Sequence, residues 1–215
     1  MYRTISALLA VAALGAAGGA AAQDSGYRFY AHVGPGQLAP DEDATIKAGG
    51  ATIPGGNVSI DSSLTAAVEL GYFVTPQIAV SITGGLPPTE DINGAGSLAP
   101  VGKLGELKYG PAALTAHYHF NGMGPFQPYV GAGVAVMYVF GDDDAAATNL
   151  EVENAMGPAV QVGANYMLGD RVGLFVDYKK AWFDTEATGN LGPAPFVADI
   201  QVDPSFFHAG VSFRF

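Results

Sequence analysis

The sequence predicts an all-β fold, an eight-stranded antiparallel up-and-down transmembrane β-barrel. Three observations lead to this prediction. The 215 residues are 49% hydrophobic and only 13% charged, whereas soluble domains carry roughly 25% charged residues. Apolar residues alternate with small or polar residues in eight separate segments, which is the period of a β-strand. Short and long connections follow one another between these segments, as in an up-and-down barrel.

The first 22 residues have the pattern of a cleaved signal peptide, so we expect the barrel domain to occupy residues 23–215. Arg3 gives a positive start, residues 5–17 are apolar and rich in small side chains, and Ala20, Ala21 and Ala22 fit the small-x-small rule. A membrane anchor helix is the alternative, but the segment is short, rich in glycine and has no stop-transfer flank. The sequence therefore predicts export, with cleavage after Ala22.

The alternating segments run one after another through the rest of the chain. They are residues 27–34, 63–72, 77–85, 113–120, 126–140, 156–167, 171–183 and 205–215. In the second segment, Leu64, Val68 and Leu70 fall on one side and Thr65 and Glu69 on the other. No later run has the roughly 20 consecutive apolar residues of a transmembrane helix. The membrane-spanning elements predicted here are therefore strands.

The connections differ in length and in charge. We expect short turns at residues 74–77, 121–125 and 168–170, and long connections at 38–62, 86–107, 141–154 and 185–198. The long connections hold most of the carboxylates. They are expected to be loops on the outer rim of one barrel domain, because loops of this length are uncommon in compact soluble domains.

The apolar side of each strand is expected to face lipid. A soluble eight-stranded barrel would turn this side inward and leave a surface of glycine, alanine, serine, threonine and histidine, which carries little charge. The inverted barrel places the small and polar side chains in a narrow lumen and leaves no unpaired backbone in hydrocarbon. Aromatic residues at strand ends fit two interfacial girdles. These are Tyr27, Tyr72, Phe120, Phe126, Phe140, Tyr166 and Phe215.

The segments "FQPYVGAGVAVMYVF", "GPAVQVGANYMLGDRVGLFVDYKKAWFDTEA" and "VDPSFFHAGVSFRF", with "LKYGPAALTAHYHF" before them, resemble the outer-membrane protein W (OmpW) family. The resemblance covers nearly the whole mature chain and departs from the family in the acidic loops. It implies an eight-stranded barrel in the outer membrane whose upper lumen is apolar. It also implies passage of small hydrophobic molecules, with a lateral opening into the bilayer. A C-terminal aromatic signal, here Phe213 and Phe215, implies delivery to the barrel assembly machinery.

The inward positions contain charges that predict a plug. Arg28, Glu69, Asp177, Lys179 and Arg214 all fall on the inward side. A narrow eight-stranded lumen is just wide enough for side chains to fill it, so Arg and Glu are expected to pair near the short-turn rim. The alternative is the selectivity ring of a small ion pore.

Toward the loop rim the predicted lumen becomes apolar. We expect Met137, Val139, Phe175, Phe183 and Phe206 to line a site for a hydrophobic ligand. Ordinary barrel filling is the alternative interpretation.

Two prolines follow the third strand. Pro87 and Pro88 cannot donate ladder hydrogen bonds, so this is where a lateral opening is predicted.

The remaining chemistry gives weak signals. Nine Lys and Arg against 20 Asp and Glu give a formal charge of −11, which argues against nucleic-acid binding. The chain has no cysteine, and all four histidines (His32, His117, His119 and His208) fall on the inward side. His117 and His119 share a face, but no third metal ligand is evident beside them. We expect no enzymatic activity, no cofactor and no metal site.

The favoured function is therefore transport of small hydrophobic molecules by a monomeric barrel embedded in outer-membrane lipid. Two alternatives remain. One is a plugged structural barrel that makes surface contacts through its acidic loops, and the other is a narrow channel for ions or polar solutes.

Overall fold

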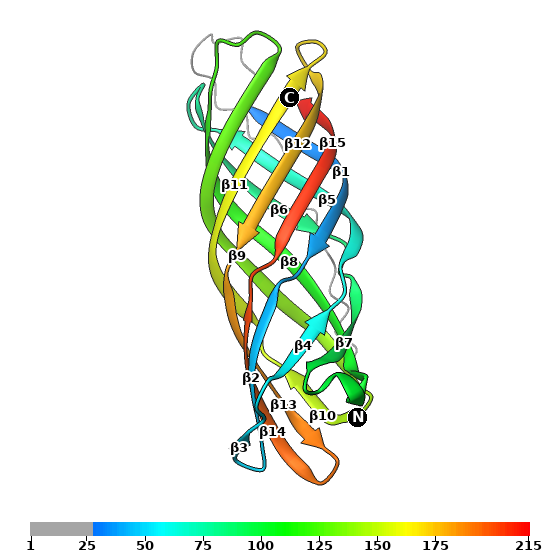
Figure 1. Cartoon of the computed structure of the whole chain (residues 1–215). Helices are drawn as coiled ribbons and strands as arrows, with labels where there is room; N and C mark the ends of the chain where they lie inside the picture. The colour runs from blue at the N-terminus through cyan, green and yellow to red at the C-terminus, as the bar shows by residue number, and fades with distance from the viewer. Residues whose placement is uncertain (1–27) are drawn as a thin grey trace, which may run out of the picture.

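The computed structural model describes residues 28–215, and these form a closed antiparallel β-barrel (Figure 1). Each barrel strand pairs with its neighbours in the order β1-β5-β6-β8-β9-β11-β12-β15, and β15 returns to β1. The predicted fold class is confirmed. The eight barrel strands are β1 (Phe29–Ala39), β5 (Ser63–Phe73), β6 (Ile78–Gly85), β8 (Lys103–His119), β9 (Phe126–Asp144), β11 (Ala155–Met167), β12 (Val172–Ala181) and β15 (Ser205–Arg214).

The first and last barrel strands close the barrel. Tyr30 lies opposite Arg214 in the ladder. Phe29 and Phe215 exchange two backbone hydrogen bonds of 2.9 Å each. Because this ladder has to reach the first strand, the apolar alternation continues to the last residue.

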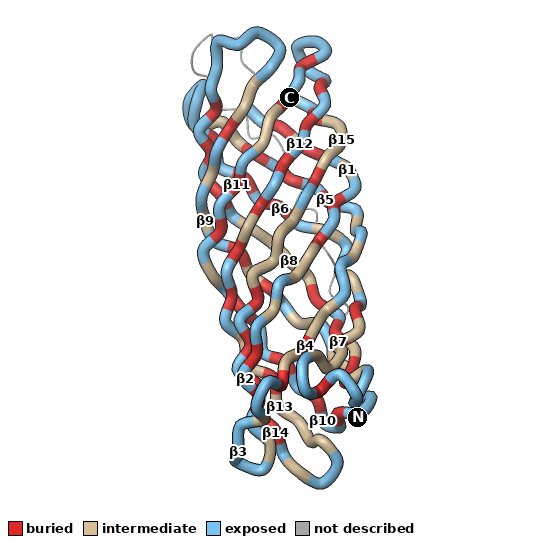
Figure 2. Tube along the Cα trace, viewed as in Figure 1, coloured by how far each residue is buried: buried red, intermediate tan, exposed pale blue. Residues whose placement is uncertain are grey.

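Outward and inward side chains alternate along the barrel strands, as Figure 2 shows by its alternating burial colours. On β12, Leu174 and Val176 are exposed, while Phe175 and Asp177 are buried. The exposed set is large and almost wholly apolar, which fits contact with lipid rather than water. Tyr27, one of the predicted girdle residues, lies outside the described residues, as does the predicted signal peptide.

Three short turns join strands at one end, which we call the short-turn end. The turn between β8 and β9 contains Gly122 and Gly124 with φ values of 104° and 66°. Only glycine adopts such angles without a steric penalty, so the "NGMGP" sequence directs the chain back at this point. No helix in residues 28–215 is long and apolar enough to cross a membrane.

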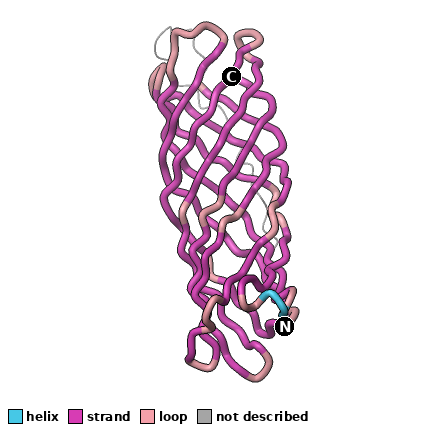
Figure 3. Tube along the Cα trace, in the orientation of Figure 1, coloured by secondary structure: helices cyan, strands magenta, loops and turns pink. Residues whose placement is uncertain are grey.

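The opposite end, which we call the extended end, is built from strands and not from loops, as Figure 3 shows. A five-stranded sheet in the order β10-β13-β14-β2-β3 continues the barrel wall there, and β4 pairs with β7 beside it. The prediction of four long loops is therefore wrong. The strands at this end are β2 (Glu42–Ala48), β3 (Ala51–Thr52), β4 (Gly56–Ile60), β7 (Thr89–Gly96), β10 (Ala147–Val152), β13 (Phe183–Leu191) and β14 (Ala194–Val202), with a short 3-10 helix η1 (Ala99–Val101) after β7.

The reason for this correction is a hydrophobic core inside the extended end. On β14, Ala198, Ile200 and Val202 are buried, and they alternate with exposed residues. Ala44 and Ile46 are buried in the same way on β2. These short alternations bury enough apolar surface to hold the connections as strands, although their exposed faces are rich in carboxylates.

Candidate functional site

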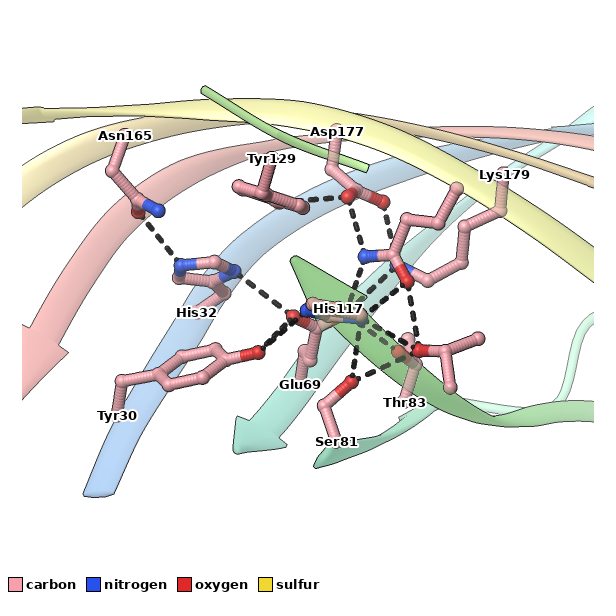
Figure 4. Close-up of polar contacts among 12 residues, drawn as sticks. Tyr30, His32, Glu69, Ser81, Thr83, His117, Tyr129, Asn165, Asp177 and Lys179 are labelled. Carbon is pink, nitrogen blue, oxygen red and sulfur yellow. Dashed lines mark hydrogen bonds and ion pairs between the residues drawn. The ribbon is translucent and has the colours of Figure 1, made fainter. Parts of the chain in front are cut away.

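A cluster of polar side chains fills part of the barrel lumen (Figure 4). Lys179 of β12 places Nζ 2.9 Å from Glu69 Oε2 and 2.5 Å from Asp177 Oδ1. Gln161 of β11 donates from Nε2 to the same Glu69 oxygen at 2.9 Å and to Asp177 Oδ2 at 2.6 Å. All four side chains are buried. One cation and one amide therefore hold two carboxylates together inside the barrel.

Hydroxyl groups donate further hydrogen bonds to both carboxylates. Glu69 accepts from Tyr30 at 3.1 Å and from Thr83 at 2.9 Å, and Asp177 accepts from Tyr129 at 2.7 Å. The hydrogen-bonded group draws side chains from seven of the eight barrel strands, all but β15. We call it the lumen plug, and its members are Tyr30, Glu69, Ser81, Thr83, Thr115, His117, Tyr129, Gln161, Asp177 and Lys179.

Aromatic rings fill the lumen on the short-turn side of the plug. His32 stacks on Phe175 with ring centroids 4.2 Å apart, and its Nε2 lies 2.8 Å from Asn165 Oδ1. His119 stacks on Tyr129 with centroids 4.9 Å apart. All four histidines are buried, as their inward register predicts. Together with the plug, these rings close the straight path through the barrel.

On the other side of the plug lies an apolar space that we call the inner cavity, of about 60 Å³. Its floor includes Lys179 and Thr83 of the plug, so it rests directly on the polar cluster. Four alanines on four consecutive strands form much of its wall: Ala113, Ala135, Ala159 and Ala181. Small side chains at one level of the barrel leave the space that larger ones would fill.

A second apolar space, which we call the outer cavity, lies within the extended end and measures about 40 Å³. Its lining is aliphatic and aromatic apart from Thr185, and it includes Ile92, Leu107 and Met137. Both cavities are smaller than the roughly 150 Å³ that holds a benzene molecule in an engineered protein core. A hydrocarbon therefore fits only when flexible side chains move aside, and methionine is suited to such movement.

The barrel wall is weakly paired next to the inner cavity. On β8 the odd-numbered backbone amides face β6, since His119 donates to the Gln77 carbonyl at 2.7 Å and Tyr109 to the Pro88 carbonyl at 3.3 Å. The ladder between β6 and β8 ends at Gly84 and Ala112. Pro111 lies within the gap and has no amide hydrogen to donate. The gap adjoins the predicted opening at Pro87 and Pro88.

The comparisons with known proteins agree with this geometry. The OmpW family matches residues 25–215. The chain belongs to the OmpW family. A curated relative, outer membrane protein AlkL of Ectopseudomonas oleovorans, is 35% identical over 81% of this chain and 76% of its own length. The dibenzothiophene metabolism operon protein DoxH of Pseudomonas sp. (strain C18) is 31% identical over 80% of this chain and 81% of its own.

Among solved structures, the crystal structure of outer membrane protein OprG from Pseudomonas aeruginosa superposes with a TM-score of 0.82 at 26% identity. It covers 88% of this chain and 96% of that one. This OmpW-family barrel is therefore an outer-membrane protein. Short turns of such barrels face the periplasm and the longer connections face outward, so the extended end is the outer end.

The structure places the predicted apolar site residues in two different regions. Met137 lines the outer cavity, and Phe183 and Phe206 line the inner cavity. Val139 is partly buried and packs against the core of the outer end. Phe175 lies on the periplasmic side of the plug, stacked on His32, so its prediction as an upper-lumen residue is wrong. The alternation identified its inward face but not its height in the barrel.

The predicted plug charges are likewise divided. Glu69, Asp177 and Lys179 form the ion-paired centre of the plug. Arg28 is exposed and donates to the Tyr72 hydroxyl at 3.2 Å, while Arg214 bonds to Gln127 near the short turns. The expected pairing of Arg with Glu69 is therefore wrong. Lys179 reaches both carboxylates because it stands two residues from Asp177 on the same inward face.

Several residues of the site were missed from the sequence. Gln161 and Tyr129 belong to the plug but carry no charge, so a search for charges passed over them. Glu90 and Tyr109 are buried at the outer end and hydrogen-bonded to each other at 2.9 Å. Glu90 lies in the connection 86–107 that was predicted to be a loop, and Tyr109 follows it by two residues. The alternation of Leu107, Tyr109 and Pro111 was the available signal.

The acidic run at residues 142–144 has a structural role in this barrel. Asp144 accepts backbone hydrogen bonds from Asn149 and Leu150, both 2.9 Å long, and Asp142 accepts one from Val152 at 3.0 Å. The backbone amides of Leu150 and Asn149 lower the pKa of Asp144. The carboxylates therefore hold the tight connection between β9 and β10.

Proposed function

We propose that this barrel admits small hydrophobic molecules through the outer membrane by way of the outer and inner cavities. The observation that carries the proposal is an apolar cavity resting on a closed polar plug. Cargo without hydrogen-bonding groups loses nothing when it enters such a lining, whereas a sugar would leave its hydroxyls unpaired there.

The relatives support this cargo class. One is named a protein of a dibenzothiophene metabolism operon, and dibenzothiophene is a small, flat, sulfur-containing aromatic molecule. The cavities are so small that even a small molecule needs side chains to move, so larger molecules are excluded.

We further propose that the cargo leaves sideways into the bilayer. The plug stands in the axial path, and the inner cavity lies beside the gap between β6 and β8. Gly84, Gly85 and Pro111 border that cavity at the gap, and Pro87 and Pro88 continue it. A wall segment with few ladder hydrogen bonds opens at a lower cost than a fully paired one.

We also propose that the barrel acts as a monomer and without an enzymatic step. Phe213 and Phe215 are 42% and 62% exposed on the outer face of the closing strand. We propose that these two aromatic side chains are the signal for the barrel assembly machinery before insertion.

The test uses cells that carry the protein in their outer membrane, because lipopolysaccharide is the barrier that slows hydrophobic compounds. The first measurement is the uptake of N-phenyl-1-naphthylamine, a neutral aromatic probe that fluoresces in apolar surroundings. The second is the swelling in arabinose of liposomes that contain the purified protein, which reports passage of a small sugar. We expect faster probe uptake than in cells without the protein, and no swelling. Met137→Glu should abolish the gain, and Met123→Glu in an exposed turn is the matched control.

Two results would contradict the proposal. Liposome swelling in arabinose would indicate a general pore. Probe uptake equal to that of cells without the protein would favour a plugged barrel that acts through its outer surface.

A further inference from the structure

A buried carboxyl group stands at the boundary between the outer and inner cavities. Glu90 of β7 is 5% exposed, and its Oε2 accepts a hydrogen bond of 2.9 Å from the Tyr109 hydroxyl. Its Oε1 and the Oγ of the nearby Ser63 are both buried, and neither makes a well-formed hydrogen bond in the described part of the chain, although the Ser63 hydroxyl lies close enough to stabilise the carboxylate. A buried acid with one oxygen that lacks a well-formed hydrogen bond is uncommon in a folded protein.

The order of residues along the strands locates this boundary. On β8, Leu107 lines the outer cavity and Pro111 lines the inner one, and Tyr109 stands between them. On β7, Ile92 lines the outer cavity and Glu90 comes next on the inward face. Glu90 and Tyr109 thus lie at a level of the barrel between the outer cavity and the inner cavity.

The adjoining strands repeat the same order. Ile60 of β4 lines the outer cavity and Thr65 of β5 lines the inner cavity, with Ser63 between them. The Tyr109 backbone amide also holds Pro88 at the edge of the gap. The pair therefore stands both between the cavities and beside the proposed lateral exit.

This layer lies outside the lipid band. On the outer face of the same strands, Lys103 pairs with Asp91 at 2.9 Å and with Glu106 at 2.5 Å. A charged outer surface of this kind is in contact with water or lipid headgroups and not with acyl chains. Glu90 therefore lies at a level where the outer face of the barrel wall borders the aqueous phase outside the cell.

The surroundings of Glu90 favour its neutral form. Burial has the largest effect and raises the pKa of Glu90, and the nearby Asp61 carboxylate raises it further. Ser63 and Tyr109 act in the opposite direction and lower that pKa. Glu42 of β2 is a second partly buried acid on this side, and burial raises its pKa too, with Glu90 adding to the effect.

No cation faces Glu90 from its neighbours among residues 28–215. Lys103 points outward into its own ion pairs, and Lys108, opposite Thr89, is exposed. Ionised Glu90 would therefore be a carboxylate without a counter-ion between two apolar cavities. Moving apolar cargo past it would strip water from the charge, which is costly.

We propose that Glu90 and Tyr109 form a proton-sensitive gate between the two cavities, which passes apolar cargo when the Glu90 carboxyl is neutral and obstructs it when that carboxyl is ionised. This inference rests on the proposed function, because it assumes that hydrophobic cargo crosses both cavities.

The test measures uptake of N-phenyl-1-naphthylamine by cells carrying the protein from pH 4.5 to pH 8, after subtraction of cells without it. We expect uptake through the wild-type barrel to fall by about tenfold as pH rises, because the desolvation penalty of an ionised carboxylate enters the barrier. Glu90→Gln keeps the shape and an acceptor for Tyr109 but cannot ionise. It should keep uptake high at every pH. Glu151→Gln, at an exposed carboxylate on β10, is the matched control and should behave as wild type.

Tyr109→Phe gives an independent readout. The Tyr109 hydroxyl stabilises the carboxylate, so its removal should move the midpoint of the pH profile upward, with uptake expressed relative to the same variant at pH 4.5. A midpoint that is unchanged or lower would overturn the gate, as would a pH profile that survives in Glu90→Gln. Wild-type cells that take up no probe at any pH would instead contradict the proposed function.

Discussion

The lumen plug and the two cavities occupy the same barrel but follow opposite rules. In the plug, Lys179 and Gln161 bridge Glu69 and Asp177, and hydroxyls donate further hydrogen bonds to both carboxylates. In the inner cavity, four alanines leave space that nothing fills. A filled polar layer is rigid and closed, because loss of one hydrogen-bonding partner leaves another buried polar group unpaired. An underfilled apolar layer is easily deformed, because its side chains can move without breaking hydrogen bonds. The difference indicates where the barrel resists cargo and where it yields.

The largest expected effect comes from removing the cation of the plug. Lys179→Met leaves Glu69 and Asp177 as an uncompensated buried pair, so the free energy of unfolding should fall by about 3–5 kcal/mol. Urea unfolding of the refolded barrel in lipid vesicles measures it. Lys47→Met is the matched control: Lys47 pairs with Asp199 at 3.3 Å, with both side chains at least half exposed. A surface pair of this kind contributes at most about 1 kcal/mol. Equal losses in the two variants would refute the account of the plug.

The second effect concerns the inner cavity. Ala135→Leu places a larger side chain into the inner cavity, so uptake of the aromatic probe should fall by about tenfold, while overpacking costs about 1–3 kcal/mol of stability. Ala132→Leu adds the same group on the outer, exposed face of the same strand. Whole-cell uptake should be unchanged in that variant. If both variants transport alike, the inner cavity is not on the route.

The third effect concerns the gap in the wall. The Tyr109 amide, 3.3 Å from the Pro88 carbonyl, should exchange its hydrogen at least about tenfold faster than the Thr115 amide within the β6–β8 ladder. Hydrogen exchange followed by NMR in lipid nanodiscs measures both amides in one sample. Strong and equal protection would argue against a lateral exit at this point.

The smallest expected effect is on the pH dependence of the free energy of unfolding. The pKa of Glu90 in the folded barrel is raised above its ordinary value of 4.5. The unfolded chain therefore loses this proton at a lower pH than the folded barrel does. Glu90 consequently lowers stability as pH rises from its ordinary pKa through its folded pKa. Glu90→Gln should remove that loss, so the urea midpoints at pH 4.5 and pH 8 should lie closer together than in wild type. An unchanged difference would place the pH dependence elsewhere.

The sequence predicted the barrel because lipid and lumen impose a strict alternation on every strand. That rule determines which way a side chain points but not its height, which is why Phe175 was assigned to the wrong half. Height depends on the stagger between neighbouring strands, as in the pairing of Phe175 with Asn165 and Gly210. Arg28 failed for a related reason, since it precedes the first strand and is free to turn outward.

The strands of the outer end were missed because their carboxylates imitate a solvated loop. The segment 42–48 carries the charged side chains of Asp43 and Lys47 on its exposed face, yet buries Ala44 and Ile46. Its pairing partner, β14, lies far away in the sequence. Such short strands are held by distant partners, and local pattern carries little of that information.

The ladder between Phe29 and Phe215 also limits how the barrel is made. The two strands that close it, β1 and β15, are the first and last strands in residues 28–215, so closure joins the most distant parts of the barrel sequence. Contacts of such long range form slowly, since the entropy of ordering the intervening chain is lost before they are gained. Until then both edge strands remain unpaired and prone to join other chains. The yield of correctly folded barrel is therefore expected to depend on how long the unpaired edge strands β1 and β15 are kept from pairing with other chains.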